Sequence, residues 1–161
     1  SIVAREKEEE LLNRFSRSFV ETVKSFDQYL SVVPEAAVAV KTGVHAMHDV
    51  TEGGIFGALW EIAEASGVGL EIDLKKIPLK QETVEICEFF GINPYELISS
   101  GSMLMAAEDG NGLVMELEKA GIPAVVIGKA TDSNDRVLLN EEERRFLEPP
   151  KTDELYKALS K

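Results

Sequence analysis

The chain has 161 residues, with 17 basic against 29 acidic side chains and a formal net charge of −12. This length suits one domain with a substantial core, and no apolar run reaches the roughly 20 residues that a membrane-spanning helix needs. So negative a chain repels phosphate backbones, which argues against nucleic acid as a partner.

The first predicted elements are helices. Residues 4–30 carry apolar side chains at three- and four-residue steps, which predicts one long amphipathic helix. Residues 34–43 predict a second, short helix, because Pro34 suits a first helical turn and Gly43 suits a helix end. Residues 44–50 then alternate in polarity, which predicts a strand.

The rest of the chain mixes both kinds of element. Apolar spacing and well-placed glycines predict helices over residues 53–65, 80–91, 111–120 and 151–160. Alternating or apolar runs predict strands over residues 68–74, 102–107, 122–130 and 136–140, the last two joined by a polar turn. Because the order lacks a strict βαβ rhythm, we predict an α+β fold in which helices cover a mixed, mainly antiparallel sheet.

The stretch HDVTEGG, residues 48–54, is the first candidate site. Here a predicted strand leads through glycines into a helix, and unpaired amides at a helix start attract anions. Gly53 and Gly54 lack a Cβ, so their backbone can approach a phosphate, to which Thr51 can donate its hydroxyl. Asp49 can hold hydrated magnesium or orient a polar group. A plain turn capped by Thr51 explains the same residues, and both interpretations stay open.

A second polar loop follows at residues 96–104. Ser99, Ser100, Gly101 and Ser102 lie just ahead of an apolar strand. Their hydroxyls and flexible backbone can bind phosphate or sugar oxygens, and an ordinary turn is an equal alternative.

The histidines and the single cysteine add little further chemistry. His45 and His48 are three residues apart, which in a strand puts them on opposite faces, so we expect no joint metal site. His48 can contact a substrate or transfer a proton beside Asp49. Cys87 has helical spacing among apolar residues and is expected to be a buried thiol, in keeping with a reducing cytoplasm.

An ordered series of motifs carries a family resemblance. MHDVTEGGIFGALWEIAEASGVGLEID is followed by IPL, by GINPYELISSGSMLMAA and by IPAVVIGKAT. Together they resemble the C-terminal domain of the aminoimidazole ribonucleotide (AIR) synthase superfamily, over roughly residues 35–140. That superfamily includes selenophosphate synthetase, thiamine-monophosphate kinase and formylglycinamidine ribonucleotide amidotransferase, and the chain is most similar to its AIR synthase-related and hydrogenase-maturation branch.

The resemblance implies a fold, a chemistry and a site. The fold is a three-layer α/β/α arrangement, and the chemistry uses ATP and magnesium to activate a carbonyl or amide oxygen by phosphorylation. By position in the motifs, Thr51, Gly53 and Gly54 are expected to bind the nucleotide phosphates. The substrate is expected to contact His48, Asp49, Ser100, Gly101 and Ser102, and no metal ligand is expected within the chain.

The resemblance also bears on what surrounds the chain. In the family an N-terminal domain carries the acidic metal ligands and forms a homodimer, so we expect residues 1–161 to be a single C-terminal domain of a cytoplasmic enzyme, inactive in isolation. Glu52 is a departure, because it puts a negative charge beside the expected phosphate. The chain also ends YKALSK, without the terminal cysteine that carries the reacting group in the hydrogenase-maturation branch. These departures favour the alternative of a non-catalytic regulatory or protein-interaction domain.

Overall fold

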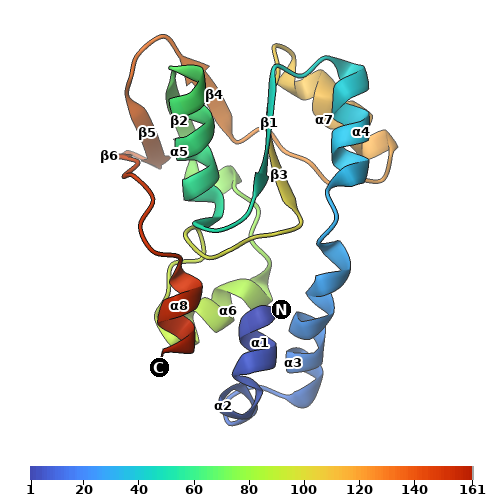
Figure 1. Cartoon of the computed structure of the whole chain (residues 1–161), viewed down its shortest axis with the longest axis vertical. Coiled ribbons are helices and arrows are strands. Elements are labelled where there is room, and N and C mark those ends of the chain that lie inside the picture. Colours follow the sequence, from blue (N-terminus) through green and yellow to red (C-terminus); the bar gives the residue numbers. More distant parts are fainter. Residues whose placement is uncertain (161) are drawn as a thin grey trace.

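The computed structural model describes residues 1–160, whose strands form two small sheets with helices packed against them (Figure 1). The helices are α1 (Ile2–Glu6), α2 (Glu8–Leu12), α3 (Arg17–Lys24), α4 (Val33–Thr42), α5 (Gly54–Ser66), α6 (Gln81–Phe90), α7 (Gly110–Lys119) and α8 (Glu154–Leu159), with the 3-10 turns η1 (Ser25–Tyr29) and η2 (Leu74–Lys76). The strands are β1 (Ala46–Val50), β2 (Gly69–Asp73), β3 (Ser102–Ala106), β4 (Gly128–Thr131), β5 (Arg136–Asn140) and β6 (Glu143–Phe146).

The sheets are mixed and mainly antiparallel, as predicted. Strands β1 and β3 form an antiparallel pair, and the other sheet has the order β4-β2-β5-β6. Within it β2 is parallel to β5, while β2–β4 and β5–β6 are antiparallel. The predicted α+β fold is therefore confirmed. A short polar turn joins β4 to β5 along the chain, as predicted, but the two strands do not pair with each other, because β2 lies between them.

The single long helix predicted over residues 4–30 is also wrong. The segment is divided into α1, α2, α3 and η1, with a turn after α2. Ser16 ends that turn by accepting a hydrogen bond from the Phe19 amide at 3.2 Å, which caps a new helix. The chain can therefore fold back, so that α3 packs on α1 and α2. The amphipathic spacing persists across the break because both parts face one core.

Two strands differ from their predicted extent for local reasons. The strand predicted at residues 122–130 begins only at Gly128, and Pro123 has no N–H to donate to a strand ladder. Strand β6 was not predicted, and all four of its residues are exposed, so it lacks the alternation that marks a half-buried strand.

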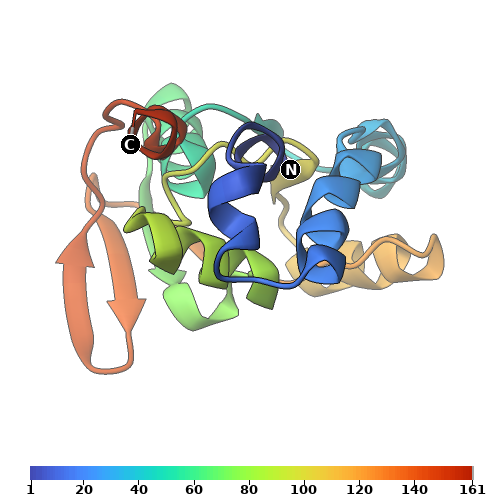
Figure 2. The same ribbon diagram turned by 90° about the horizontal axis from the view of Figure 1, so that it is seen from below.

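The apolar side chains form three clusters that divide the molecule. One joins α1, α2, α3, α6 and α8, and the view from below shows α1 (dark blue) between α8 (red) and α3 (Figure 2). The second packs α5 on the four-stranded sheet, and the third packs α4 and α7 together. Helices thus cover both faces of the β1–β3 pair, since Leu104 joins the second cluster and Met105 the third.

Candidate functional site

The two predicted binding loops meet where β1 leads into α5. We call residues 51–54 the glycine loop and residues 95–102 the serine loop. Val50 pairs with Ser102 at the end of the β1–β3 ladder, and the Ser99 amide donates to the Thr51 carbonyl at 3.4 Å. In the first turn of α5, the Phe56 amide donates to the Tyr95 carbonyl at 3.0 Å. Backbone hydrogen bonds therefore hold the two loops side by side.

Glycines let these loops approach so closely. Gly54 has φ of +63°, and a Cβ added there would lie 2.5 Å from the Tyr95 carbonyl oxygen and 2.7 Å from that of Leu97. Gly101 has φ of +97°, and a Cβ there would collide with the carbonyl oxygen of Tyr29. Both positions thus require glycine for contacts within the chain.

The prediction that Gly53 and Gly54 offer unpaired amides is wrong. The Gly53 amide donates to Oδ2 of Asp153 at 2.6 Å, and the Gly54 amide donates to the Thr51 carbonyl at 3.1 Å. Both glycines are buried. The cause is a segment near the end of the chain, which brings a carboxylate to the start of α5, where an anion is favoured.

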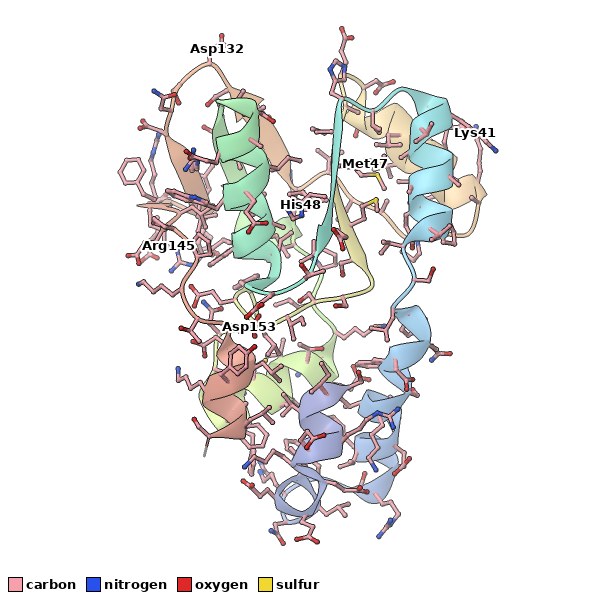
Figure 3. All side chains as sticks on the ribbon, in the orientation of Figure 1. Lys41, Met47, His48, Asp132, Arg145 and Asp153 are labelled. Atoms are coloured by element: carbon pink, nitrogen blue, oxygen red, sulfur yellow. The ribbon has the colours of Figure 1, made fainter. Side chains whose placement is uncertain are left out.

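Asp153 also lies at this site, and the sequence did not predict its place there. Its side chain is only 2% exposed, and its Oδ1 accepts hydrogen bonds from the amides of Ile98, at 3.2 Å, and Leu155, at 2.7 Å. Figure 3 shows Asp153 between the foot of α5 and the start of α8. The helix predicted over residues 151–160 includes Asp153, whereas α8 begins at Glu154, so Asp153 is the N-cap, which explains the Leu155 bond. No residue near Asp153 in the sequence indicates its hydrogen bonds from the Gly53 and Ile98 amides.

The outer side of the loop pair keeps its polar side chains accessible. Asp49, Thr51, Glu52, Ser100 and Ser102 are all exposed. Beneath the loops lies a cavity of about 20 Å³, lined among others by Gly53, Phe56 and Pro150. This space holds no more than about one water molecule. A ligand larger than a water molecule therefore cannot lie in this cavity.

The structure does not bring the side chains of His48 and Asp49 together. His48 points toward α5, where its Nε2 lies 2.8 Å from Oε2 of Glu61, whereas Met47 points toward α4 (Figure 3). Nδ1 of His48 lies 2.7 Å from the main-chain oxygen of Asp49. Asp49 alternates with His48 along β1, so its side chain lies on the face of Met47. The substrate role predicted for His48 stays a prediction, and its two ring nitrogens contact Glu61 of α5 and the main chain of Asp49.

Cys87 and the acidic residues add no second site. Cys87 is 1% exposed, as predicted, and burial, with the Glu154 carboxylate as a lesser cause, raises the pKa of its thiol to about 11. Within residues 1–160, no group of three or more His, Cys, Asp or Glu side chains is placed to hold a metal ion. The same residues contain no helix of the length and apolarity that a bilayer requires.

Comparison with known proteins places the chain in one protein family. Residues 2–140 match the family described as AIR synthase related protein, C-terminal domain. A putative hydrogenase expression/formation protein of Methanocaldococcus jannaschii is 32% identical over 133 residues, which cover 80% of this chain and 40% of that protein. The carbamoyl dehydratase HypE of Rhodobacter capsulatus is 33% identical over 97 residues, which cover 58% of this chain and 28% of that protein.

Solved structures agree on the fold. A crystal structure of E. coli HypE superposes with a TM-score of 0.70 at 25% identity, covering 79% of this chain and 41% of that one. Thiamine monophosphate kinase from Aquifex aeolicus gives a TM-score of 0.56 at 20% identity, covering 89% and 48%. The chain thus spans less than half the length of each protein that it matches here.

Proposed function

The chain belongs to the AIR synthase-related protein family, and on that premise we propose that it is the C-terminal domain of an ATP- and Mg²⁺-dependent enzyme. The enzyme would activate a carbonyl or amide oxygen by phosphoryl transfer. Relatives named carbamoyl dehydratase HypE, and a HypE structure solved in complex with ATP, support this proposal. Because those proteins are more than twice as long as the matched segment, the activity is proposed for a longer parent protein, with this chain as one contributor.

The observation that carries the proposal is the meeting of the two loops. Hydroxyls from both, those of Thr51, Ser100 and Ser102, are exposed at one end of the β1–β3 pair. Hydroxyl groups can donate to phosphoryl or substrate oxygens, and an exposed Asp49 carboxylate suits one position of a hydrated Mg²⁺. Bound MgATP would supply the phosphoryl group, and the residues of this chain would position it.

The roles of the glycines change in this proposal. Gly53 and Gly54 were expected to offer amides to phosphate, but those amides have partners within the chain. Their proposed contribution to cofactor binding is therefore the shape of the loop, which presents Thr51 outward. Gly101 contributes in the same way, because it lets the serine loop lie against the carbonyl of Tyr29.

One observation favours the alternative of a non-catalytic regulatory or protein-interaction domain. The carboxylate of Asp153 already accepts the hydrogen bond of the Gly53 amide, and Glu52 has a second, exposed carboxylate on the same loop. Two negative groups beside a phosphate site oppose the binding of a nucleotide. In this alternative the contact between the two loops stabilises the fold and binds no nucleotide.

Calorimetric titration of the longer parent protein with MgATP tests the proposal. We expect saturable binding that weakens when Thr51 is replaced by valine. A heat signal no greater than that of buffer would overturn the enzymatic proposal and favour the alternative. The cytoplasmic location and the homodimer are further parts of the proposal, and sedimentation of the parent protein tests the dimer.

A further inference from the structure

We propose that Asp153 is a positioning residue through which the end of the chain holds the glycine loop and the serine loop in one arrangement. We call residues 148–160 the strap. Opening of the loop pair and release of the strap would then be one event. The functional meaning of this inference rests on the proposed function, because it concerns how Thr51 and the serines are presented. Asp153 lies beyond residues 2–140, the part that matches the family.

The first step is that the two carboxylate oxygens of Asp153 accept hydrogen bonds from different segments of the chain. Oδ2 accepts from Gly53 in the glycine loop, while Oδ1 accepts from Ile98 in the serine loop and from Leu155 in α8. Hydrogen bonds to an ionised acceptor are stronger than neutral ones, and burial strengthens them further. At 2% exposure, water cannot readily replace the carboxylate. Both loops therefore depend on this one side chain.

The second step is the anchoring of the strap itself. Ala158 is fully buried in the cluster of α1, α2, α3, α6 and α8, and Leu155 packs against that cluster. The Glu154 amide donates to the Glu96 carbonyl at 3.3 Å, and Oε2 of Glu154 accepts from the Asn93 amide at 3.2 Å. Because α8 is packed on the helical core, the carboxylate of Asp153 has a fixed position, and its hydrogen bonds hold the two loops relative to that core.

The third step is the cover that the strap provides. A Cβ on Gly53 would lie 3.8 Å from Cβ of Pro150, and one on Gly57 would lie 3.9 Å from it, so the strap runs over the start of α5. Pro149 and Pro150 restrict the backbone of this part of the strap. The small cavity beneath has room for about one water molecule. The strap thus limits the ways in which the glycine loop can move.

An Asp153→Asn variant separates positioning from helix capping. Asparagine caps a helix as well as aspartate does, so the Leu155 bond can persist. An amide, however, has one acceptor oxygen where the carboxylate has two, so either Gly53 loses its partner while Ile98 and Leu155 keep theirs, or Ile98 and Leu155 both lose theirs. Asp109→Asn is the matched control, because Asp109 caps α7 through the Gly112 amide at 2.9 Å and touches neither loop.

Amide hydrogen exchange, read residue by residue by NMR, is the measurement. In Asp153→Asn we expect the Gly53 or the Ile98 amide to exchange about tenfold faster or more, since a bond to a charged group is lost. Amides in the α4–α7 cluster should keep their wild-type rates, as should all loop amides in Asp109→Asn. A folded Asp153→Asn protein with wild-type protection at both Gly53 and Ile98 would overturn the inference.

A measurement on the wild-type chain covers the case in which Asp153→Asn fails to fold. In low denaturant, the amides of Gly53, Ile98 and Leu155 should exchange with one common opening free energy, as members of one cooperative unit do. Separate opening of Gly53 while Leu155 stays protected would contradict the inference. These readouts need no nucleotide, so their failure leaves the proposed function standing. Coupled exchange without MgATP binding would count against the proposed function alone.

Discussion

The backbones of Gly54 and Tyr95 are in close contact. A Cβ added to Gly54 would lie only 2.5 Å from the Tyr95 carbonyl oxygen. Gly54 also has φ of +63°, a conformation that side chains with a Cβ rarely adopt. Position 54 therefore requires glycine for two reasons, its own backbone conformation and the close approach of the serine loop. This contact within the chain holds the glycine loop against the serine loop without the help of a ligand.

Replacing Gly54 by alanine should destabilise the fold by about 2–4 kcal/mol, because a strained φ adds to a clash with backbone that cannot easily move. Gly67→Ala is a matched control, since Gly67 has the same φ of +63° and nothing within 4 Å of a new Cβ. That variant should lose only about 1 kcal/mol, the conformational part. Denaturant unfolding of both variants makes the comparison, and equal losses would show that the Tyr95 contact carries no cost.

Local signals in the sequence identified most of the regular elements. Residues 136–140 were predicted as a strand and form β5. The helix predicted over residues 53–65 forms as α5, Gly54–Ser66, and Gly67 caps it in the left-handed conformation. Such signals depend on residues only a few positions apart. The insertion of β2 between β4 and β5 depends on pairing across the chain, which periodicity cannot reveal.

The candidate site divides in the same way. The family resemblance identified the glycine loop and the serine loop and implied that they line one place, and in the structure they are neighbours. The amide partner was not predictable, because Asp153 lies 100 positions after Gly53. A buried carboxylate that reaches three amides arises from the packing of α8, and its sequence signature is only that of a helix cap.

The hydroxyl of Thr51 should contribute directly to nucleotide binding. Thr51 is exposed, and its role within the fold is played by its carbonyl, which accepts from Gly54 and Ser99. Thr51→Val keeps that carbonyl and removes the donor, so MgATP affinity of the parent protein should fall about tenfold with little change in Tm. Calorimetry and thermal unfolding provide the two values.

Thr22→Val is the control for this substitution, because Thr22 is exposed on α3 and its hydroxyl donates to the Ser18 carbonyl. It should leave MgATP binding unchanged. Equal affinity in the Thr51 and Thr22 variants would remove Thr51 from the proposed site.

The charge of Glu52 should oppose the binding of a nucleotide. Its side chain is exposed on the glycine loop, next to Thr51. A unit charge a few ångströms from another contributes about 1 kcal/mol in water, so Glu52→Gln should raise MgATP affinity about fivefold at low salt. Added salt should reduce that gain.

Glu118→Gln on α7 removes the same charge away from the loop pair, and its affinity should match the wild type at every salt concentration. If Glu52→Gln binds MgATP no better than Glu118→Gln, the phosphate does not lie beside the glycine loop. The two variants have the same net charge, so general repulsion by the acidic chain cancels in the comparison.

Cys87 should behave as an inert core thiol whose ionisation opposes folding. Burial raises its pKa to about 11, above the ordinary value of 9.0, so at pH 8 the folded protein holds the neutral thiol and a thiol reagent should label it only on unfolding. Between pH 9 and 11 the unfolded chain loses this proton while the folded chain keeps it, so the free energy of unfolding falls as the pH rises. Two pKa units correspond to at most about 3 kcal/mol. Tyrosines and lysines titrate in the same range, so the measurement is the difference between the wild type and Cys87→Ala, whose stability lacks the thiol contribution. A difference that stays constant from pH 8 to pH 11 would contradict the raised pKa.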